Sequence, residues 1–322
     1  GAGVRLVPAS LRKWGFTNVS LVEEQAVIDG NFPTVESPNP EERKTMAKAI
    51  ELGSRLGADL VLATDPDSDR IGVALRNAKG EYVLLNGNQT LSLIMAYQLT
   101  RWSELGRLDG KEFVVKTIVT SQMPNVMAAH FGVKCYDCLT GFKYIARIIR
   151  NNEGKATYIG GGEESFGYLA GDFVRDKDAV STSLLICQMA QYYKLQGKNL
   201  ADAMHELYEK YGYYHNKTIS LSYPGAEGAA KMAGIMAGLR ENPPAELAGS
   251  KIEAVVDYNT CVNGLPKANV IEFDLEGGNK GIVRPSGTEP KIKLYIFAKG
   301  ADAAEADAAL DAIEESGRKL LA

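Results

Sequence analysis

Residues 58–70 read ADLVLATDPDSDR, and they decide how the first part of the chain folds. The apolar run 58–63 is typical of a short buried strand. It leads directly into an acidic loop, 65–70, in which a carboxylate stands at every second position. Because α/β proteins bind ligands beyond the carboxyl ends of their strands, this stretch predicts an α/β unit with a binding site at the end of the strand.

The acidic loop predicts a metal site. Alternating carboxylates can converge on one hard cation, and oxygen ligands suit Mg²⁺ or Ca²⁺ better than zinc. A calcium loop of the EF-hand type needs Gly at its sixth position and Glu at its twelfth, whereas counting from Asp65 gives Arg70 and Arg76. We therefore expect Asp65, Asp67 and Asp69 to bind a divalent metal, with a solvated acidic loop as the alternative.

The surrounding sequence alternates between helical and strand patterns. A helix is expected over 40–56, with Asn39 as its cap and Pro40 at its first position. Further strands are expected at 71–75 and 82–85, and the alternation continues to about residue 211. This pattern indicates α/β units with mostly parallel sheets, whereas the remainder of the chain has an α+β pattern.

The length of 322 residues favours several domains, since one hydrophobic core seldom grows that large. We expect the α/β class, as two α/β mixed-sheet domains followed by a smaller α+β C-terminal domain. The predicted boundaries are 1–106, 107–212 and 213–322.

Composition excludes several classes of function. The net charge of -4 brings no basic excess, so no nucleic-acid partner is expected. No apolar run is long enough to span a bilayer, and no signal sequence is visible, which predicts a cytoplasmic protein without a membrane partner. Cys135 and Cys138 have C-x-x-C spacing, but no second pair completes a zinc site, so we expect no metal or redox role for them.

A glycine-rich loop at 161–167 is the second candidate site. Glu163 and Ser165 alternate in it and could present polar groups to adjacent sugar hydroxyls, while the glycines let the backbone approach a ligand. Glycine-rich turns are common, so an ordinary turn remains the alternative.

The third candidate is the loop 284–290, RPSGTEP, which could wrap a phosphate. Arg284 offers a charged fork, Ser286 and Thr288 offer hydroxyls, and the amides around Gly287 can form an anion nest. A polar hairpin is the alternative. Weaker candidates for contact with an anionic ligand are Lys143 and the run 175–178.

Taken together and in this order, the three loops resemble those of the α-D-phosphohexomutase superfamily, and the resemblance covers essentially all 322 residues. The loop 65–70 is similar to the family's metal-binding loop, with Pro66 and Ser68 where glycine is usual. Residues 163–165 resemble its sugar-binding loop, 284–289 resemble its phosphate-binding loop, and 32–40 resembles its phosphoglucomutase and phosphopentomutase members.

The resemblance implies a role for each matching residue. Asp65, Asp67 and Asp69 would hold Mg²⁺, and Arg70 would act in catalysis beside the transferred phosphoryl group. The substrate would be bound by residues of all three loops and by one lysine: Lys143, Glu163, Ser165, Arg284, Ser286, Gly287 and Thr288. The implied reaction interconverts hexose 1-phosphate and hexose 6-phosphate, with glucose as the expected sugar and glucose 1,6-bisphosphate as intermediate.

The start of the sequence resembles a point just after the first strand of the family's second domain, so the resemblance implies that residues 1–106 lack that strand. In this family the phosphoryl donor is a phosphoserine in a preceding domain, and no serine here has the matching context. The resemblance therefore implies that the partner of these residues is an N-terminal domain of the same polypeptide, and that they are inactive alone. The alternatives left open are a phosphomannomutase or phosphopentomutase, a haloacid-dehalogenase-like phosphatase with Asp65 as nucleophile, and a phosphosugar-binding module.

Overall fold

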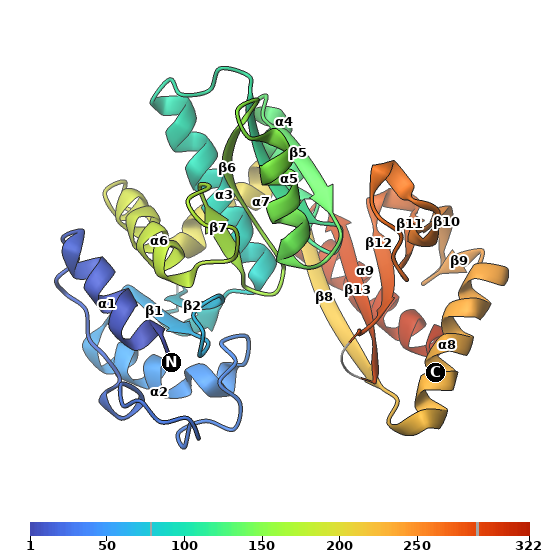
Figure 1. Ribbon diagram of the computed structural model, residues 1–322, viewed down its shortest axis with the longest axis horizontal. Helices are drawn as coiled ribbons and strands as arrows, with labels where there is room; N and C mark the ends of the chain where they lie inside the picture. Colours follow the sequence, from blue (N-terminus) through green and yellow to red (C-terminus); the bar gives the residue numbers. More distant parts are fainter. Residues whose placement is uncertain (78, 288–289) are drawn as a thin grey trace. The chain divides into compact units, whose positions relative to one another are not determined.

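The computed structural model describes residues 1–77, 79–287 and 290–322, in two compact units, 1–207 and 208–322. Figure 1 labels most of their helices and strands. Helices and sheets are mixed in both, which confirms the predicted α/β and α+β class.

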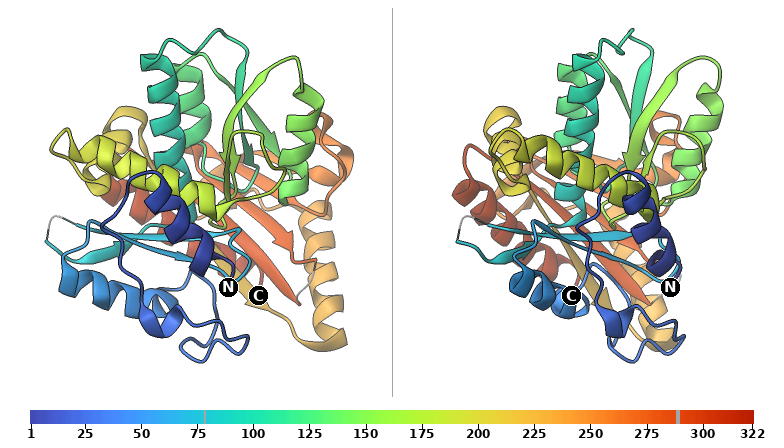
Figure 2. Two further views of the ribbon diagram at one scale, coloured as in Figure 1. Left: turned by 60° about the vertical axis from the view of Figure 1, so that its left-hand side comes forward. Right: turned by 90° about the vertical axis from the view of Figure 1, so that its left-hand side faces the viewer.

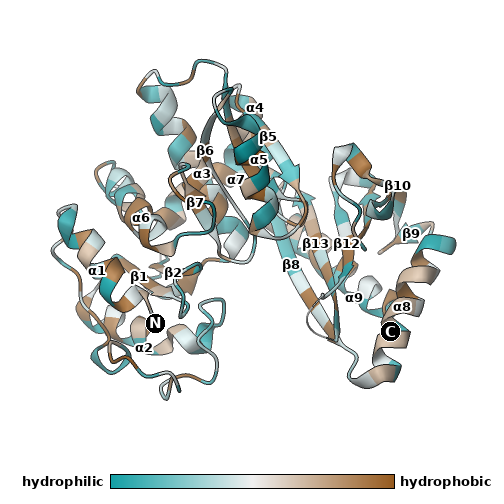
Figure 3. Cartoon of the chain, viewed as in Figure 1, coloured by the Kyte–Doolittle hydropathy of each residue, from teal (hydrophilic) through white to brown (hydrophobic). Residues whose placement is uncertain are grey.

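The first unit opens with a part built around a three-stranded sheet. Its elements are α1 (Gly3–Lys13), α2 (Arg43–Leu56), β1 (Leu60–Thr64), β2 (Ile71–Arg76) and β3 (Tyr82–Leu84), with a 3-10 turn at Glu23–Gln25. The sheet order is β1-β2-β3, and both pairings are antiparallel. Strand β2 is buried until Arg76 and is coloured as hydrophobic in Figure 3.

Two details of this part correct the sequence prediction. The sheet is an antiparallel meander, because short loops join its successive strands, and short loops cannot make the crossover that parallel pairing needs. Helix α2 begins at Arg43 rather than Pro40, and Asn39 does not cap it. The Asn39 side chain instead accepts a hydrogen bond from the backbone N–H of Glu41, at 3.1 Å, in a local turn before the helix.

The rest of the first unit is built on a four-stranded sheet of order β5-β4-β6-β7. Strand β4 pairs in parallel with β5 and β6, as predicted, and β7 runs antiparallel to β6. The elements are α3 (Gly87–Glu104), β4 (Glu112–Thr117), α4 (Met123–His130), β5 (Lys134–Cys138), α5 (Phe142–Asn152), β6 (Thr157–Gly162), β7 (Tyr168–Ala170) and α6 (Ala179–Lys194). Helix α7 (Leu200–Tyr211) spans the division between the units.

Helix packing ties the first unit together. Helix α3 packs against β6 and α4, and α6 packs against α1, which lie side by side in Figure 2. The N-terminus of α3 is closed by a capping box, in which the Asn86 side chain accepts from Gln89 N–H and the Gln89 side chain accepts from Asn86 N–H. The proposed boundary at residue 106, just after α3, remains a prediction.

The second unit is an antiparallel sheet of order β8-β13-β12-β11-β10-β9, against which α8 and α9 pack. Apolar residues of β11, β12 and β13, with Met236 and Ile313, form its core. Its elements are β8 (Tyr213–Ser222), α8 (Gly225–Glu241), β9 (Glu246–Leu247), β10 (Ser250–Asp257), β11 (Ile271–Leu275), β12 (Lys280–Pro285), β13 (Lys291–Gly300) and α9 (Ala303–Leu320), with 3-10 turns at Tyr258–Thr260, Val262–Gly264 and Glu276–Gly278.

Candidate functional site

The acidic loop lies between β1 and β2, and its carboxylates converge. One oxygen each from Asp65, Asp67 and Asp69 lies within 4.8 Å of the others. The loop turns at Ser68, whose φ of 61° is left-handed backbone. Glycine adopts that conformation most readily, so a serine at this position is uncommon. The donor set consists of hard carboxylate oxygens and therefore fits Mg²⁺.

Asp65 is the buried member of the three, with 3% of its side chain exposed. Its Oδ1 accepts from the backbone N–H groups of Asp69 and Arg70, both at 3.1 Å. Its Oδ2 accepts from Arg70 Nε at 2.7 Å. Burial alone would raise the pKa of Asp65, but the hydrogen bonds from Arg70 outweigh it and lower the pKa. Asp65 is therefore held ionised.

Arg70 is fixed by three further side chains. Its Nη1 donates to Glu41 Oε1 at 3.0 Å and to Asn39 Oδ1 at 3.3 Å, and its Nε lies 3.8 Å from Asp69 Oδ1. The local sequence suggested Asn39 only as a helix cap. Its contact with Arg70 joins residues 31 positions apart, and no spacing pattern in the sequence indicates it.

The glycine-rich loop connects β6 to β7 and closes through a hydrogen bond from Glu163 N–H to the Gly167 carbonyl, at 2.9 Å. The Glu163 side chain is 6% exposed, and its Oε1 accepts from Gly141 N–H at 2.7 Å. Burial raises the pKa of Glu163, and the hydrogen bond from Gly141 N–H offsets this rise only in part. Gly141, whose amide makes this bond, has a φ of 116°, a backbone conformation that favours glycine.

The other two residues of this loop differ in their surroundings. Glu164 points toward the end of β4, where its Oε2 accepts from Thr117 Oγ1 at 3.0 Å. Ser165 is half-buried. Lys143 lies in the first turn of α5, is exposed, and has its Nζ 5.1 Å from the centre of the Tyr144 ring.

The acidic loop and the glycine-rich loop meet within the first unit. Ile71 N–H donates to the Phe166 carbonyl at 3.0 Å, and Arg70 forms an antiparallel bridge with Gly167. Ala179 N–H, at the start of α6, donates to the Ser68 carbonyl at 2.9 Å. Two of the three predicted loops are therefore held together by backbone hydrogen bonds.

The third loop belongs to the second unit, between β12 and β13. Arg284 is at the end of β12, and its Nη1 lies 3.5 Å from the Tyr295 hydroxyl. Ser286 N–H donates to the Lys291 carbonyl at 2.8 Å, and Gly287 is exposed. Thr288 lies outside the residues that the structure describes.

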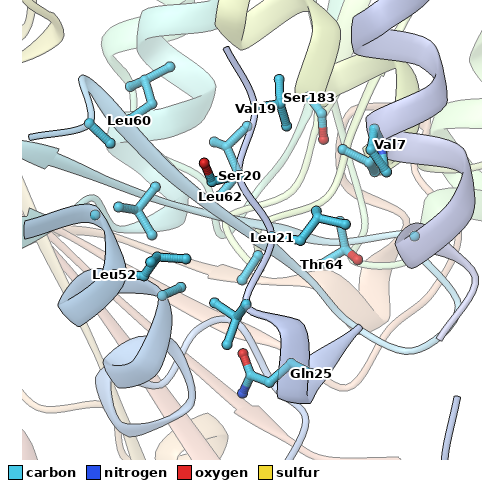
Figure 4. A pocket seen from close by; sticks show the side chains of 18 of the residues that line it. Val7, Val19, Ser20, Leu21, Gln25, Leu52, Leu60, Leu62, Thr64 and Ser183 are labelled. Atoms are coloured by element: carbon cyan, nitrogen blue, oxygen red, sulfur yellow. The ribbon is translucent and has the colours of Figure 1, made fainter. Parts of the chain in front are cut away.

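Two further features of the first unit are a cavity, which Asp65 and Pro66 of the acidic loop help to line, and a pair of thiols. The cavity of about 1070 Å³ lies beside β1 and is largely apolar, with Val7, Leu21, Leu52 and Leu60 among its lining (Figure 4). Cys135 and Cys138 are free thiols on β5, and burial raises the pKa of Cys135 to about 12. A thiol with so high a pKa stays protonated at neutral pH.

Three family models match the chain. They are described as phosphoglucomutase/phosphomannomutase, alpha/beta/alpha domain II at residues 1–80, alpha/beta/alpha domain III at 86–211, and the C-terminal domain at 236–316. The chain is 38% identical over 313 residues to a phosphoglucomutase of Staphylococcus aureus strain MRSA252. That match covers 94% of this chain and 56% of the relative's length.

Solved structures share the fold. A phosphoglucomutase from Paramecium, pp63/parafusin in its open form, superposes with a TM-score of 0.69 at 19% identity, covering 98% of this chain and 55% of the other. A phosphoglucomutase/phosphomannomutase family protein from Burkholderia thailandensis gives 0.67 at 18% identity, covering 98% and 57%. The chain belongs to the α-D-phosphohexomutase superfamily. Within the described residues, no helix combines the length and apolarity needed to cross a bilayer.

Proposed function

We propose that these 322 residues form the metal-binding, sugar-binding and phosphate-binding part of a phosphohexomutase, with glucose phosphate as the preferred substrate. The observation that carries the proposal is the hydrogen-bonded junction between the acidic loop and the glycine-rich loop, at Ile71 and Phe166. A metal loop and a sugar loop that meet in this way can hold a phosphosugar between a cation and hydroxyl-binding groups.

The proposed roles follow the chemistry of each side chain. Asp65, Asp67 and Asp69 would hold Mg²⁺, which when bound neutralises charge on the transferred phosphoryl group. Arg70 would add a fixed positive charge beside them, because Glu41 and Asn39 hold its guanidinium in place. Glu163 and Ser165 would bind sugar hydroxyls, and Lys143 would help to orient the substrate.

The phosphate that is not transferred would be held in the second unit by Arg284, Ser286, Gly287 and Thr288. Arg284 supplies a bidentate fork, and the other three supply hydroxyl and amide donors. The phosphoseryl donor would come from a further domain of the same polypeptide, because the family carries it outside the three domains matched here. We therefore expect ligand binding without turnover from these residues alone.

A phosphatase with Asp65 as its nucleophile is less well supported. Both carboxylate oxygens of Asp65 already accept hydrogen bonds, and the side chain is almost entirely buried. An attacking oxygen would have to leave Arg70 and reach a phosphorus atom. Release of inorganic phosphate from a sugar phosphate by this chain would favour the phosphatase instead.

Calorimetry tests the proposal. Glucose 1,6-bisphosphate would be titrated with Mg²⁺ into the wild-type chain, Asp67→Ala, Arg284→Ala and the control Lys251→Ala, which changes an exposed lysine on β10. Loss of a charged contact to phosphate or metal should weaken binding about tenfold or more in the first two variants and leave the control unchanged. Competition by the mannose, ribose and glucosamine bisphosphates would rank the sugars. Equal affinity in all four proteins would refute the proposed site.

A further inference from the structure

Lys177 reaches the acidic loop from a segment more than one hundred residues further along the chain. Its Nζ lies 2.8 Å from Asp69 Oδ2 and 3.0 Å from Asp176 Oδ1. The run 175–178 was predicted as a contact for an anionic ligand, but here the ammonium contacts one of the three converging carboxylates. The ion pair therefore joins the acidic loop to the segment that precedes α6.

The position of Lys177 is fixed from several sides. Its side chain is 15% exposed, and its ammonium lies 5.4 Å from the centre of the Phe142 ring. Its aliphatic stem covers Gly167, where an added Cβ would lie only 2.1 Å from Lys177 Cδ. The backbone that follows it is also held, because Asp178 N–H donates to the Tyr168 carbonyl and Ala179 N–H to the Ser68 carbonyl. This contact is consequently more constrained than an ordinary surface ion pair.

Two cations thus pair with two of the three carboxylates. Arg70 forms an ion pair with Asp65, and Lys177 forms one with Asp69, whereas Asp67 is exposed. A divalent ion bound by the three carboxylates would lie within a few ångströms of the Lys177 ammonium. Like charges at such a separation repel by an amount that matters for affinity, even with the screening typical of a protein surface.

The geometry points to Lys177 as a built-in counter-ion of the metal loop, one that occupies Asp69 before the metal binds and competes with Mg²⁺ for that carboxylate. The inference rests on the proposed metal site. Binding of Mg²⁺ would loosen the ammonium from Asp69 beside the glycine-rich loop. The Lys177 stem covers Gly167, whose carbonyl accepts from the backbone N–H of Glu163 at 2.9 Å. Lys177 would in this way transmit the effect of metal binding to the glycine-rich loop.

The test measures Mn²⁺ binding to the whole chain, with electron paramagnetic resonance used to detect the free ion. Lys177→Met keeps the stem that covers Gly167 and removes only the charge, so Mn²⁺ should bind at least about fivefold more tightly than in wild type. Lys177→Arg keeps the charge and should stay near wild type. Lys194→Met is the matched control, since it removes an exposed lysine paired with Asp59 at the other end of α6.

A second readout follows the ammonium itself. In wild-type chain labelled with ¹⁵N at lysine, the Nζ resonance that is missing from Lys177→Met should shift when Mg²⁺ is added. Unchanged or weaker Mn²⁺ binding in Lys177→Met would overturn the counter-ion role while leaving the metal site intact. Absence of Mn²⁺ binding from wild type and Lys177→Met alike would overturn the metal site as well. Thermal unfolding of each variant would verify that it is folded.

Discussion

The backbone N–H of Ile71 donates to the carbonyl of Phe166 at 3.0 Å, so the first residue of β2 is hydrogen-bonded to the loop between β6 and β7. This single bond joins the strand that follows the acidic loop to the loop that carries Glu163. Residues 95 positions apart in the sequence meet here. A substitution on one side of the junction should therefore affect the residues on the other side.

Gly87→Ala should also disturb this junction, because Gly87, at the start of α3, lies against the glycine-rich loop. A Cβ at Gly87 would lie 1.8 Å from the backbone carbonyl oxygen of Glu164, and a backbone atom cannot rotate away as a side chain can. We expect a loss of about 3 kcal/mol in the free energy of unfolding, measured by urea denaturation. Gly30→Ala, with open space around the added methyl group, is the control. Equal stability of the two variants would show that the backbone at the N-terminus of α3 can shift at little cost in free energy.

Two glycines of α8 should respond in opposite directions to alanine. Gly234 has open space around it, so Gly234→Ala should stabilise the second unit by about 0.5–1 kcal/mol through helix propensity. Gly228→Ala should destabilise it, because its Cβ would lie 2.0 Å from the Tyr223 carbonyl oxygen. Melting temperatures of the two variants test this, and a fall for Gly234→Ala would mean that the helix surface there is covered.

Lys116 and Asp137 should show the asymmetry of a partly buried ion pair. Lys116 is fully buried, its Nζ lies 2.8 Å from Asp137 Oδ1, and Asp137 is 40% exposed. Asp137→Ala leaves a buried ammonium without its carboxylate and should cost about 2 kcal/mol, less than for a fully buried pair because solvent reaches the site.

The double variant Lys116→Met/Asp137→Ala should recover most of that loss, since an apolar side chain of similar length replaces the charge. Urea unfolding of the wild type, both single variants and the double variant completes the cycle. A double variant that is less stable than Asp137→Ala would indicate that the Lys116 ammonium is needed by Thr117 and Thr120, whose carbonyls lie 3.3 Å from it.

Glu163 should make stability depend on pH. Its pKa is raised above the ordinary value of 4.5 by burial, so folding favours the protonated form. The stability it contributes is fully present below pH 4.5 and is lost as the pH rises through the raised pKa. Compared with Glu163→Gln, the wild-type melting temperature should therefore fall more between about pH 4.5 and pH 7.5. Glu51→Gln, on the exposed face of α2, should follow the wild type.

Local sequence patterns predicted much of the framework. The strand at β2 and the parallel pairing of β4 with its neighbours follow from the pattern of apolar residues and from the alternation of helices and strands. Helices α1 and α8 were not predicted. Helix α1 contains Pro8, and α8 contains Gly228, Gly234 and Gly238, and both residue types weaken a helical pattern that tertiary packing then stabilises.

The sequence by itself determined the chemistry that is available, namely three alternating carboxylates after a buried strand, a glycine-rich loop and an arginine-containing loop in the family's order. Only the tertiary structure decided which charges meet. The contacts of Arg70 with Glu41 and of Lys177 with Asp69 join segments far apart along the chain. Periodicity reports only how each residue faces its own helix or strand, so contacts of that kind become visible only when the separate elements have packed.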